Sequence, residues 1–429
     1  MLYNTLKIYS IVRSKTLVDH LYAIGLCIPY KRLLEVTKQL YDGMISTFPS
    51  DKTFIPKHLR KGIFTVLAKD NLDLNATSPF VTSYYHGTSI SILQFPTTNN
   101  KGTPLPDVVF KEASQKSLQL QLLPEEYTNP SKLTLGKLSK DLWAPLCSVN
   151  IDDIKEFPEL KKGLAEERYW LQQTLDAGET SCKGWSQFHA SRGKEVQTPR
   201  GINSIAPLLR KKVATLEMQN HIMKLNQRTV AALNPGQTVV DWSDCPVYAL
   251  TKEMMFLDPL SYICYVAFMG GLHIQQTLLV TFGQLIKGCG LLAILEQNNF
   301  STLGLSAVVN VNHIARAMYA LQVLMSTLYA KLKETCSSAN FKGDPMAWLK
   351  DHAKISSMCQ FLYLVMTLGL QILLYVRSIR EGNFKLHVEV LRKLIPWFFI
   401  FDHFYYGRWT TVHLFDLMIL EKMHPDVYR

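Results

Sequence analysis

The stretch Phe64-Thr-Val-Leu-Ala-Lys-Asp70-Asn-Leu-Asp73 predicts a buried strand that runs directly into two acidic side chains. Two later stretches have the same form, Thr238-Val-Val-Asp-Trp-Ser-Asp244-Cys-Pro and Tyr265-Val-Ala-Phe-Met-Gly-Gly-Leu-His273. An acid at the end of a buried strand is costly unless another group pairs with it. Because three stretches share this form, we expect their polar ends to meet in one site. Carboxylates and an imidazole that meet at strand ends could bind Mg²⁺ or Mn²⁺.

The residues around the first stretch predict a small sheet. Ile63–Leu67 is apolar and Thr88–Phe95 alternates, so together they predict an antiparallel strand pair with both acids of the first stretch near its turn. Gln237–Trp242 and Tyr262–Met269 predict two more strands, each followed by a helix. We therefore expect a mixed α/β, helix-rich fold with a small RNase H-like sheet, a large insertion and a helical C-terminal region.

A chain of 429 residues is long enough for several domains. In the N-terminal part, Pro29 interrupts a helical pattern, which predicts two helices joined by a turn at 25–29. A further helix is expected at Leu208–Leu233. In chain order we expect a basic helical hairpin at 1–60, an RNase H-like core at 61–98 and 236–290, an insertion at 99–235 that is irregular and then helical, and a helical region at 291–429.

The charge of the chain favours a polyanionic partner. The formal net charge is +11, and residues 1–69 hold 11 Lys and Arg against four Asp and Glu. Such an excess is typical of nucleic-acid binding, with a solvated basic face as the alternative. We expect DNA as the partner, with Lys57, Arg60 and Lys61 contacting phosphates and binding that weakens steeply with salt.

Several other classes of protein are disfavoured. The eight cysteines include no Cys-x-x-Cys pair, so a zinc finger is not expected, and free thiols are typical of an intracellular protein of the nucleus or cytoplasm. The sequence has no Walker A, Gly-x-Ser-x-Gly, His-Glu-x-x-His or dinucleotide-binding motif. These absences argue against an NTPase, a hydrolase, a zinc protease or a dehydrogenase. No small-molecule cofactor is expected.

One segment has the length of a membrane span. Cys359–Val376 is almost entirely apolar, although Gln360 and Gln371 interrupt it. We favour a buried core helix and expect no membrane contact, and a membrane protein that uses residues 359–376 is an alternative.

The three opening stretches suggest roles for their polar residues. In an RNase H-like fold, the first strand carries an acid and a later strand brings a second acid beside it. Asp70, Asp244 and His273 are the candidate catalytic residues and metal ligands, with Asp73 as a further ligand or a replacement for Asp70. Asp241 is the alternative to Asp244. Two Mg²⁺ or Mn²⁺ ions about 4 Å apart would then activate a water or a 3′-hydroxyl.

Each of these residues also has a structural interpretation. Asp70 and Asp73 suit a turn, because aspartate bonds its own backbone there. Asp244 suits the N-cap of the following helix, and Pro246 in the first turn supports this. His273 suits a hydrogen-bonded structural role after its two glycines.

A second acidic cluster lies near the C-terminus. The stretch Trp397-Phe-Phe-Ile-Phe-Asp402-His403-Phe-Tyr-Tyr-Gly-Arg408-Trp places an acid and an imidazole among aromatic side chains. Polar groups in such surroundings need partners. We expect Asp402 to pair with Arg408 or Arg380, with a role as a further metal ligand as the alternative.

Many of these motifs occur in the same order in one known family. The chain resembles a multi-copy, mobile-element-associated family of uncharacterised proteins that is frequent in invertebrate genomes. A weaker resemblance to fungal transposon-borne proteins implies an RNase H-like transposase core. The shared motifs include Leu59-Arg-Lys-Gly-Ile-Phe-Thr-Val, Asp70-Asn-Leu-Asp73, Tyr85-His-Gly-Thr-Ser-Ile-Ser, Leu122-Leu-Pro-Glu-Glu-Tyr-Thr, Leu233-Asn-Pro-Gly-Gln-Thr, Asp244-Cys-Pro-Val-Tyr-Ala-Leu, Gly270-Gly-Leu-His, Arg380-Glu-Gly-Asn-Phe and Tyr406-Gly-Arg-Trp.

The chain departs from that family at sites that affect function. The family carries Asp-Gln-Pro at Asp244-Cys-Pro, His-Asn-Pro at Leu74-Asn-Ala, and an acid at Gln275. If that acid is the third ligand, this copy has lost activity. We therefore expect a transposon-derived protein that was ancestrally a metal-dependent DNA-cleaving or strand-transfer enzyme, and decay of this copy only if that acid is a ligand. A non-catalytic nucleic-acid-binding or structural protein is the alternative.

Overall fold

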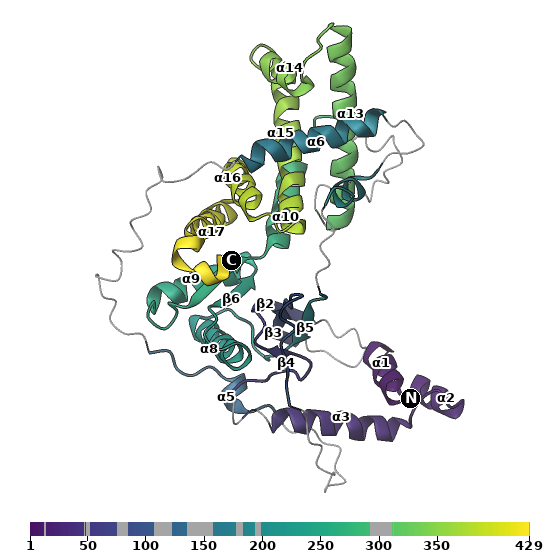
Figure 1. The fold of residues 1–429 in the computed structure, drawn as a ribbon, viewed down its shortest axis with the longest axis vertical. Helices are drawn as coiled ribbons and strands as arrows, with labels where there is room; N and C mark the ends of the chain where they lie inside the picture. The colour runs from purple at the N-terminus through teal and green to yellow at the C-terminus, as the bar shows by residue number, and fades with distance from the viewer. Residues whose placement is uncertain are drawn as a thin grey trace. The chain divides into compact units, whose positions relative to one another are not determined.

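The computed structural model describes residues 1–12, 14–46, 48, 52–74, 85–106, 122–134, 158–176, 183–193, 199–291, 311 and 313–428. The chain forms two compact units. The first comprises Met1–Leu138 and Thr198–Ala267, and the second comprises Ser139–Gln197 and Phe268–Arg429. Figure 1 traces the chain through both units.

The first unit is built on a five-stranded sheet with the order β5-β3-β2-β6-β7. Strand β2 is antiparallel to β3 and parallel to β6, and β3 is antiparallel to β5. The expected mixed α/β, helix-rich fold with a small sheet is therefore confirmed. The strands are β2 (Thr65–Leu74), β3 (Tyr85–Gln94), β5 (Ile202–Ile205), β6 (Val239–Ser243) and β7 (Tyr265–Met269).

Strand β2 is longer than the sequence predicted. It continues past the apolar run to Leu74, because each added residue pairs with one on β3. Asp70 lies opposite Ser89, and Asp73 lies opposite His86. Both acids therefore belong to the strand itself, and Asp73 lies one residue before its end.

Two helices cover one face of the sheet and bury the core of the first unit. They are α8 (Leu216–Leu233) and α9 (Cys245–Leu257). Their buried residues join apolar residues of β2, β3 and β6 in one cluster. The expected helix from residue 208 begins at Leu216 instead, because Thr215 caps it by accepting from the Met218 N–H at 3.2 Å. Both β5 and α8 fall inside the range expected as an insertion, yet they belong to the sheet unit.

Among its described residues, the N-terminal part has three helices of eight or more residues where two were expected. They are α1 (Leu2–Val12), α2 (Lys15–Ala23) and α3 (Tyr30–Ile45), and Pro29 is the N-cap of α3 as its position suggested. Short elements connect this part to the sheet. They are β1 (Arg60–Lys61), which pairs with β4 (Thr103–Pro104), and α5 (Glu125–Thr128).

Among its described residues, the second unit is helical apart from the end of β7. Helix α15 contacts α16, α10, α14, α13 and α6, and most of its second half is buried. Gly163 allows α6 to approach α15, because a Cβ there would lie 2.9 Å from Leu374 Cδ2. The helices are α6 (Glu159–Asp176), α7 (Trp185–Ala190), α10 (Gly271–Ile286), α13 (Ile314–Ser338), α14 (Pro345–His352), α15 (Ser357–Arg380), α16 (Phe384–Ile400), α17 (Phe404–Met423) and α18 (Pro425–Tyr428).

Helix α15 contains the segment that was weighed as a membrane span. Among the described residues it is the one helix long and apolar enough to cross a membrane, and 56% of its most apolar stretch is buried. The core helix of a soluble protein meets the same criteria, so this helix is weak evidence for a span.

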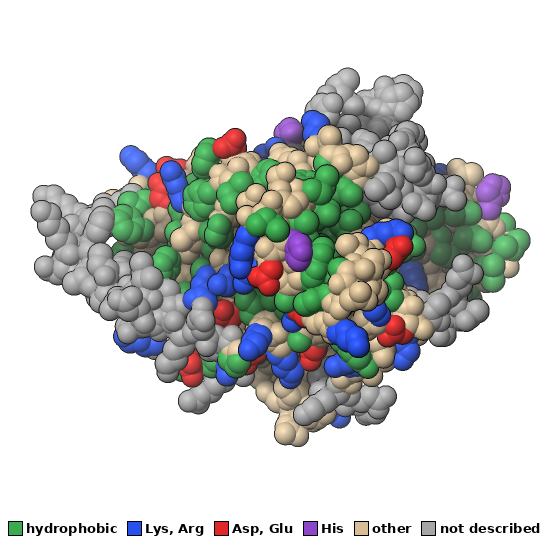
Figure 2. Space-filling view, turned by 90° about the horizontal axis from the view of Figure 1, so that it is seen from above, with side chains coloured by type: hydrophobic (Ala, Val, Ile, Leu, Met, Phe, Trp, Pro, Cys, Tyr) green, Lys and Arg blue, Asp and Glu red, His purple; other side chains and the backbone are tan. Residues whose placement is uncertain are grey.

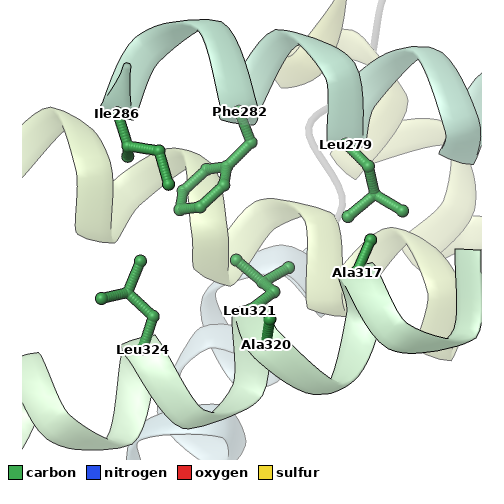
Figure 3. A pocket seen from close by; sticks show the side chains of 7 residues that line it. All are labelled: Leu279, Phe282, Ile286, Ala317, Ala320, Leu321 and Leu324. Atoms are coloured by element: carbon green, nitrogen blue, oxygen red, sulfur yellow. The ribbon is translucent and has the colours of Figure 1, made fainter. Parts of the chain in front are cut away.

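The seam between α10 and α13 leaves only a very small cavity. Figure 3 shows its apolar side chains, with Phe282 of α10 facing Leu321 of α13. Its volume is about 10 Å³, which is too small for a ligand.

Candidate functional site

Asp70 and Asp244 occupy neighbouring positions on two parallel strands. The register of β2 and β6 pairs Lys69 with Ser243, and each acid is the next residue along its chain. Neighbouring strands lie about 4.8 Å apart, so the two backbones are close enough for both carboxylates to bind one cation. Asp70 is exposed and Asp244 is half-buried. Two of the three opening stretches of the sequence therefore do meet.

Asp244 also has a structural role. It is the N-cap of α9, and its Oδ1 accepts a hydrogen bond of 3.1 Å from the Val247 N–H. Pro246 lies in the first turn, as expected for a capped helix start.

A buried charged network, which we call the Lys69 network, lies directly beside these two acids. The ammonium of Lys69 forms an ion pair with Asp241 Oδ2, and both side chains are fully buried. The Tyr265 hydroxyl donates to the same oxygen at 2.8 Å, and Asn226 Nδ2 donates to that hydroxyl at 3.1 Å. Burial lowers the pKa of Lys69, whereas Asp241 and then Asp244 act to raise it. Asp241 is thus engaged by Lys69 and Tyr265 rather than open to a metal.

Two oxygens near this network have no hydrogen-bond partner among the described residues. They are Asp241 Oδ1 and Ser243 Oγ, and both are buried. Ser243 is the residue that pairs with Lys69 in the ladder. Unsatisfied buried oxygens are rare in folded proteins and call for an explanation in each case.

The other two predicted ligands, Asp73 and His273, lie on different elements. Asp73 lies on β2 opposite His86. His273 lies in the second unit, half-buried in the first turn of α10. Its preceding glycine, Gly271, has a packing role, because a Cβ there would lie 2.8 Å from Ile379 Cδ1 of α15. Within the described ranges, no group of three or more His, Cys, Asp or Glu side chains is arranged to hold a metal ion.

The basic residues predicted to contact phosphates lie near the other end of β2. Lys57 and Lys61 are exposed, and Arg60 donates to the Lys101 carbonyl at 2.7 Å. The Arg60 N–H also bonds Gln94, which pairs with Thr65 at the start of β2. Asp70 is five residues further along the strand, which corresponds to roughly 16 Å. These side chains therefore lie along the sheet from the acids rather than beside them.

A different basic segment, Arg210-Lys211-Lys212, runs past the acids. The Leu209 N–H donates to the Thr88 carbonyl at 3.0 Å, and Thr88 Oγ1 donates to the Lys211 carbonyl at 2.7 Å. The Val213 N–H then donates to Oδ1 of Asn71, the residue after Asp70, at 2.9 Å. The sequence prediction missed this segment, although its three consecutive basic residues are visible in the sequence.

Elsewhere the charges are mixed. On the face that Figure 2 shows, Lys and Arg side chains alternate with Asp and Glu and with hydrophobic groups. The net positive charge of the chain does not gather into one patch on that face. The Arg210–Lys212 segment is therefore identified by its contacts rather than by a visible basic surface.

The C-terminal aromatic cluster has a structural explanation. Asp402 has a positive φ of 60° and ends α16 in a Schellman turn. In this turn the His403 N–H donates to the Phe398 carbonyl at 2.7 Å. Arg380 donates to Ser186 Oγ and lies over the Trp185 ring, while Arg408 is exposed. Among the described residues, Arg380 therefore contacts Ser186 and Trp185, and the expected ion pair with Asp402 is not formed.

Comparison with known proteins bears only on the C-terminal part of the chain. A family model described as "Domain of unknown function (DUF8702)" matches residues 359–429. These residues cover most of α15 and all of α16 and α17, so the match does not include Asp70 or Asp244. No curated protein and no solved structure matches the chain.

Proposed function

We propose that this chain is a transposon-derived protein whose sheet supports metal-dependent cleavage or strand transfer of DNA. The observation that carries the proposal is the register of β2 and β6, which makes Asp70 and Asp244 neighbours. Mg²⁺ sites commonly use one or two carboxylates and complete their coordination with substrate phosphates and water. Two adjacent acids thus fit the donor set of such a site.

The order of the strands supports an RNase H-like core. In that arrangement, three antiparallel strands are extended, on the side of the first, by strands parallel to it. Here β2, β3 and β5 form the antiparallel set, and β6 and β7 extend the sheet beside β2. Helix α8 connects β5 to β6, and α9 connects β6 to β7. This order is the reason for proposing RNase H-like chemistry rather than another use of two acids.

The roles proposed for the chain's own residues follow from their surroundings. Asp70 and Asp244 would hold the cations, which supply Lewis-acid activation of a water or a 3′-hydroxyl when bound. The Lys69 ammonium lies close enough to Asp244 for that carboxylate to act to raise the lysine pKa, against the larger effect of burial. Lys211, exposed next to this end of the sheet, would attract the phosphates.

The proposal is tested by incubating the full chain with a supercoiled plasmid and Mn²⁺ and measuring strand breaks. We expect nicking by the wild type and its loss in Asp70→Asn and in Asp244→Asn. Asparagine caps helices about as well as aspartate, so Asp244→Asn removes the ligand charge and keeps α9 capped. The matched control is Asp19→Asn, an exposed acid of α2 that should leave nicking unchanged.

The second candidate is a non-catalytic DNA-binding protein on the same fold, which the Arg210–Lys212 segment favours. In that case the wild type would bind oligonucleotides in EDTA and would not nick the plasmid in Mn²⁺. Asp70→Asn would then bind DNA at least as tightly as the wild type, because it removes a negative charge near the phosphates.

A further inference from the structure

The first unit contains a cavity beside the edge strand β5. Its volume is about 650 Å³, within the range typical of ligand sites. Tyr41 of α3 and Phe54 contribute aromatic walls, and Ile205 and Ala206 contribute apolar surface at the end of β5. Arg210 is its one charged lining residue. We call this cavity the Tyr41 pocket.

One wall of the Tyr41 pocket is fixed by packing. Phe54 is 1% exposed and meets the Tyr127 ring edge-on, with centroids 4.7 Å apart. The Tyr127 hydroxyl donates to the Pro207 carbonyl at 2.6 Å, which holds the segment after β5 in place. The pocket is thus built on buried, hydrogen-bonded parts of the fold rather than on surface side chains alone.

Arg210 supplies positive charge to the Tyr41 pocket. Burial raises the pKa of the Tyr41 phenol, and the exposed Arg210 lies close enough to oppose that shift. The neighbouring acid Asp42 is compensated by Lys38, with Oδ2 and Nζ 2.8 Å apart. An occupant should therefore combine a flat or apolar body with a negative charge at Arg210.

The Tyr41 pocket is connected to the candidate acids by the Arg210–Lys212 segment. Arg210 lines the pocket, and three residues later Val213 bonds Asn71 beside Asp70. An extended segment of this length spans on the order of 10 Å. A chain of phosphates could therefore contact Arg210 and Lys211 while one end lies at the pocket and the other at Asp70.

We propose that the Tyr41 pocket takes one unpaired nucleobase of a single DNA strand, with its phosphates on Arg210 and Lys211. A base has a flat face for Tyr41, and its phosphates supply the charge that Arg210 selects. This inference rests on the proposed function for the identity of DNA as substrate. An acidic peptide is the competing occupant, and it would use the charge of Arg210 without requiring a flat ring.

The test is the fluorescence anisotropy of two labelled ten-nucleotide strands in EDTA, with the full chain. One strand is oligothymidylate, and the other has the same sugar-phosphate backbone without bases. Because stacking contributes through the base alone, we expect the wild type to bind the first about ten-fold more tightly. Tyr41→Leu keeps apolar volume on α3 and should reduce that ratio to near one. Equal affinity of the wild type for both strands would overturn the proposal.

Charge and stacking are separated by further variants. Arg210→Ala should weaken the binding of both strands and lower the slope of affinity against salt by about one unit. Lys224→Ala is the matched control, since Lys224 is an exposed cation on α8 away from the pocket, and it should leave the base-dependent ratio unchanged. If polyglutamate displaces both strands equally well, the site recognises charge alone and the proposal is wrong.

The strand-binding assay and the plasmid-nicking assay test the Tyr41 pocket and the proposed function separately. The binding assay contains no metal, so Asp244→Asn should retain the preference for the strand with bases even if no plasmid is ever nicked. Conversely, nicking that depends on Asp70 and Asp244 without any preference for bases would overturn the pocket and leave the proposed function standing.

Discussion

Each unit of the molecule buries a charged cluster, and the two clusters are satisfied to different degrees. In the first unit, Asp241 directs one oxygen to Lys69 and Tyr265, and its other oxygen has no partner among the described residues. In the second unit, both oxygens of Glu167 are engaged. Trp185 Nε1 donates to Oε2 at 2.8 Å, and Arg377 Nη1 lies 3.3 Å from Oε1.

This difference separates a packing role from a functional one. The Glu167 cluster joins α6, α7 and α15, and Arg377 is shared with Glu166 and Glu381. Such a network fixes helices, because each carboxylate oxygen of Glu167 has a described partner. The Lys69 network instead lies next to two acids on adjacent strands, one exposed and one half-buried. A charged network with unsatisfied buried oxygens beside two acids on adjacent strands is the pattern expected at a site rather than in a core.

The largest effect on stability should come from the Lys69 network. Lys69→Met leaves the Asp241 carboxylate buried without its cation, so we expect the free energy of unfolding to fall by about 3–5 kcal/mol. The double variant Lys69→Met/Asp241→Leu removes both charges and should recover most of the loss. Urea denaturation of the full chain measures both. A double variant as unstable as the single one would show that the network contributes more than paired charges.

The second unit should be the more sensitive to acid through His387. This side chain lies on α16, and burial lowers its pKa to about 4. Because the unfolded histidine titrates near 6.5, the unfolded state binds more protons between pH 6.5 and 4. The free energy of unfolding should therefore decrease as pH falls through this window, by at most about 3 kcal/mol. His387→Gln should flatten this dependence, whereas the exposed His20→Gln should not, as thermal melts between pH 7 and 4 will show.

A smaller effect is expected in the Glu167 cluster. Glu167→Gln keeps an acceptor for Trp185 and leaves Arg377 with Glu166 and Glu381. We expect a loss of about 1–3 kcal/mol, since only one charged partner is removed. Urea denaturation measures this loss. If Glu167→Gln lost more free energy of unfolding than Lys69→Met, the conclusion that the Glu167 cluster is the better satisfied of the two would be wrong.

The smallest effect separates the two roles of Asp244. Asp244→Ala removes the cap of α9 and should cost about 1 kcal/mol in the free energy of unfolding, whereas Asp244→Asn should cost only a few tenths. Thermal melts of both variants provide the measurement. If Asn were as destabilising as Ala, the charge of Asp244 would be needed for folding, and loss of nicking in that variant would not identify a ligand.

The sequence predicted the sheet and most of its helices, because their apolar patterns are local. Tyr265–Met269 and α10 were found within a few residues of their observed ends. Strand β5 was missed, since Ile202-Asn-Ser-Ile205 is short, has polar residues at its centre and pairs with β3 only through tertiary contacts. The extension of β2 was missed for the same reason, because the partner strand rather than the local sequence continues the ladder.

The site was predicted in part. The carboxylates at strand ends pointed to Asp70 and Asp244, but their adjacency depends on strand register, which a single sequence does not define. Lys69 alternates with the buried Leu67 and so faces the core, yet a lysine there is identified only when its partner Asp241 is seen. Arg210 and Lys211 lie far along the chain from Asp70, and only the bond from Val213 to Asn71 reveals that they are close.

The central claim is that Asp70 and Asp244 form one cation site, and calorimetric titration with Mn²⁺ tests it most directly. The account predicts binding by the wild-type chain, its loss in both Asp70→Asn and Asp244→Asn, and its retention in Asp19→Asn. Wild-type binding that survives both substitutions, or a wild type that binds no Mn²⁺, would contradict the claim and leave the two acids as a strand residue and a helix cap.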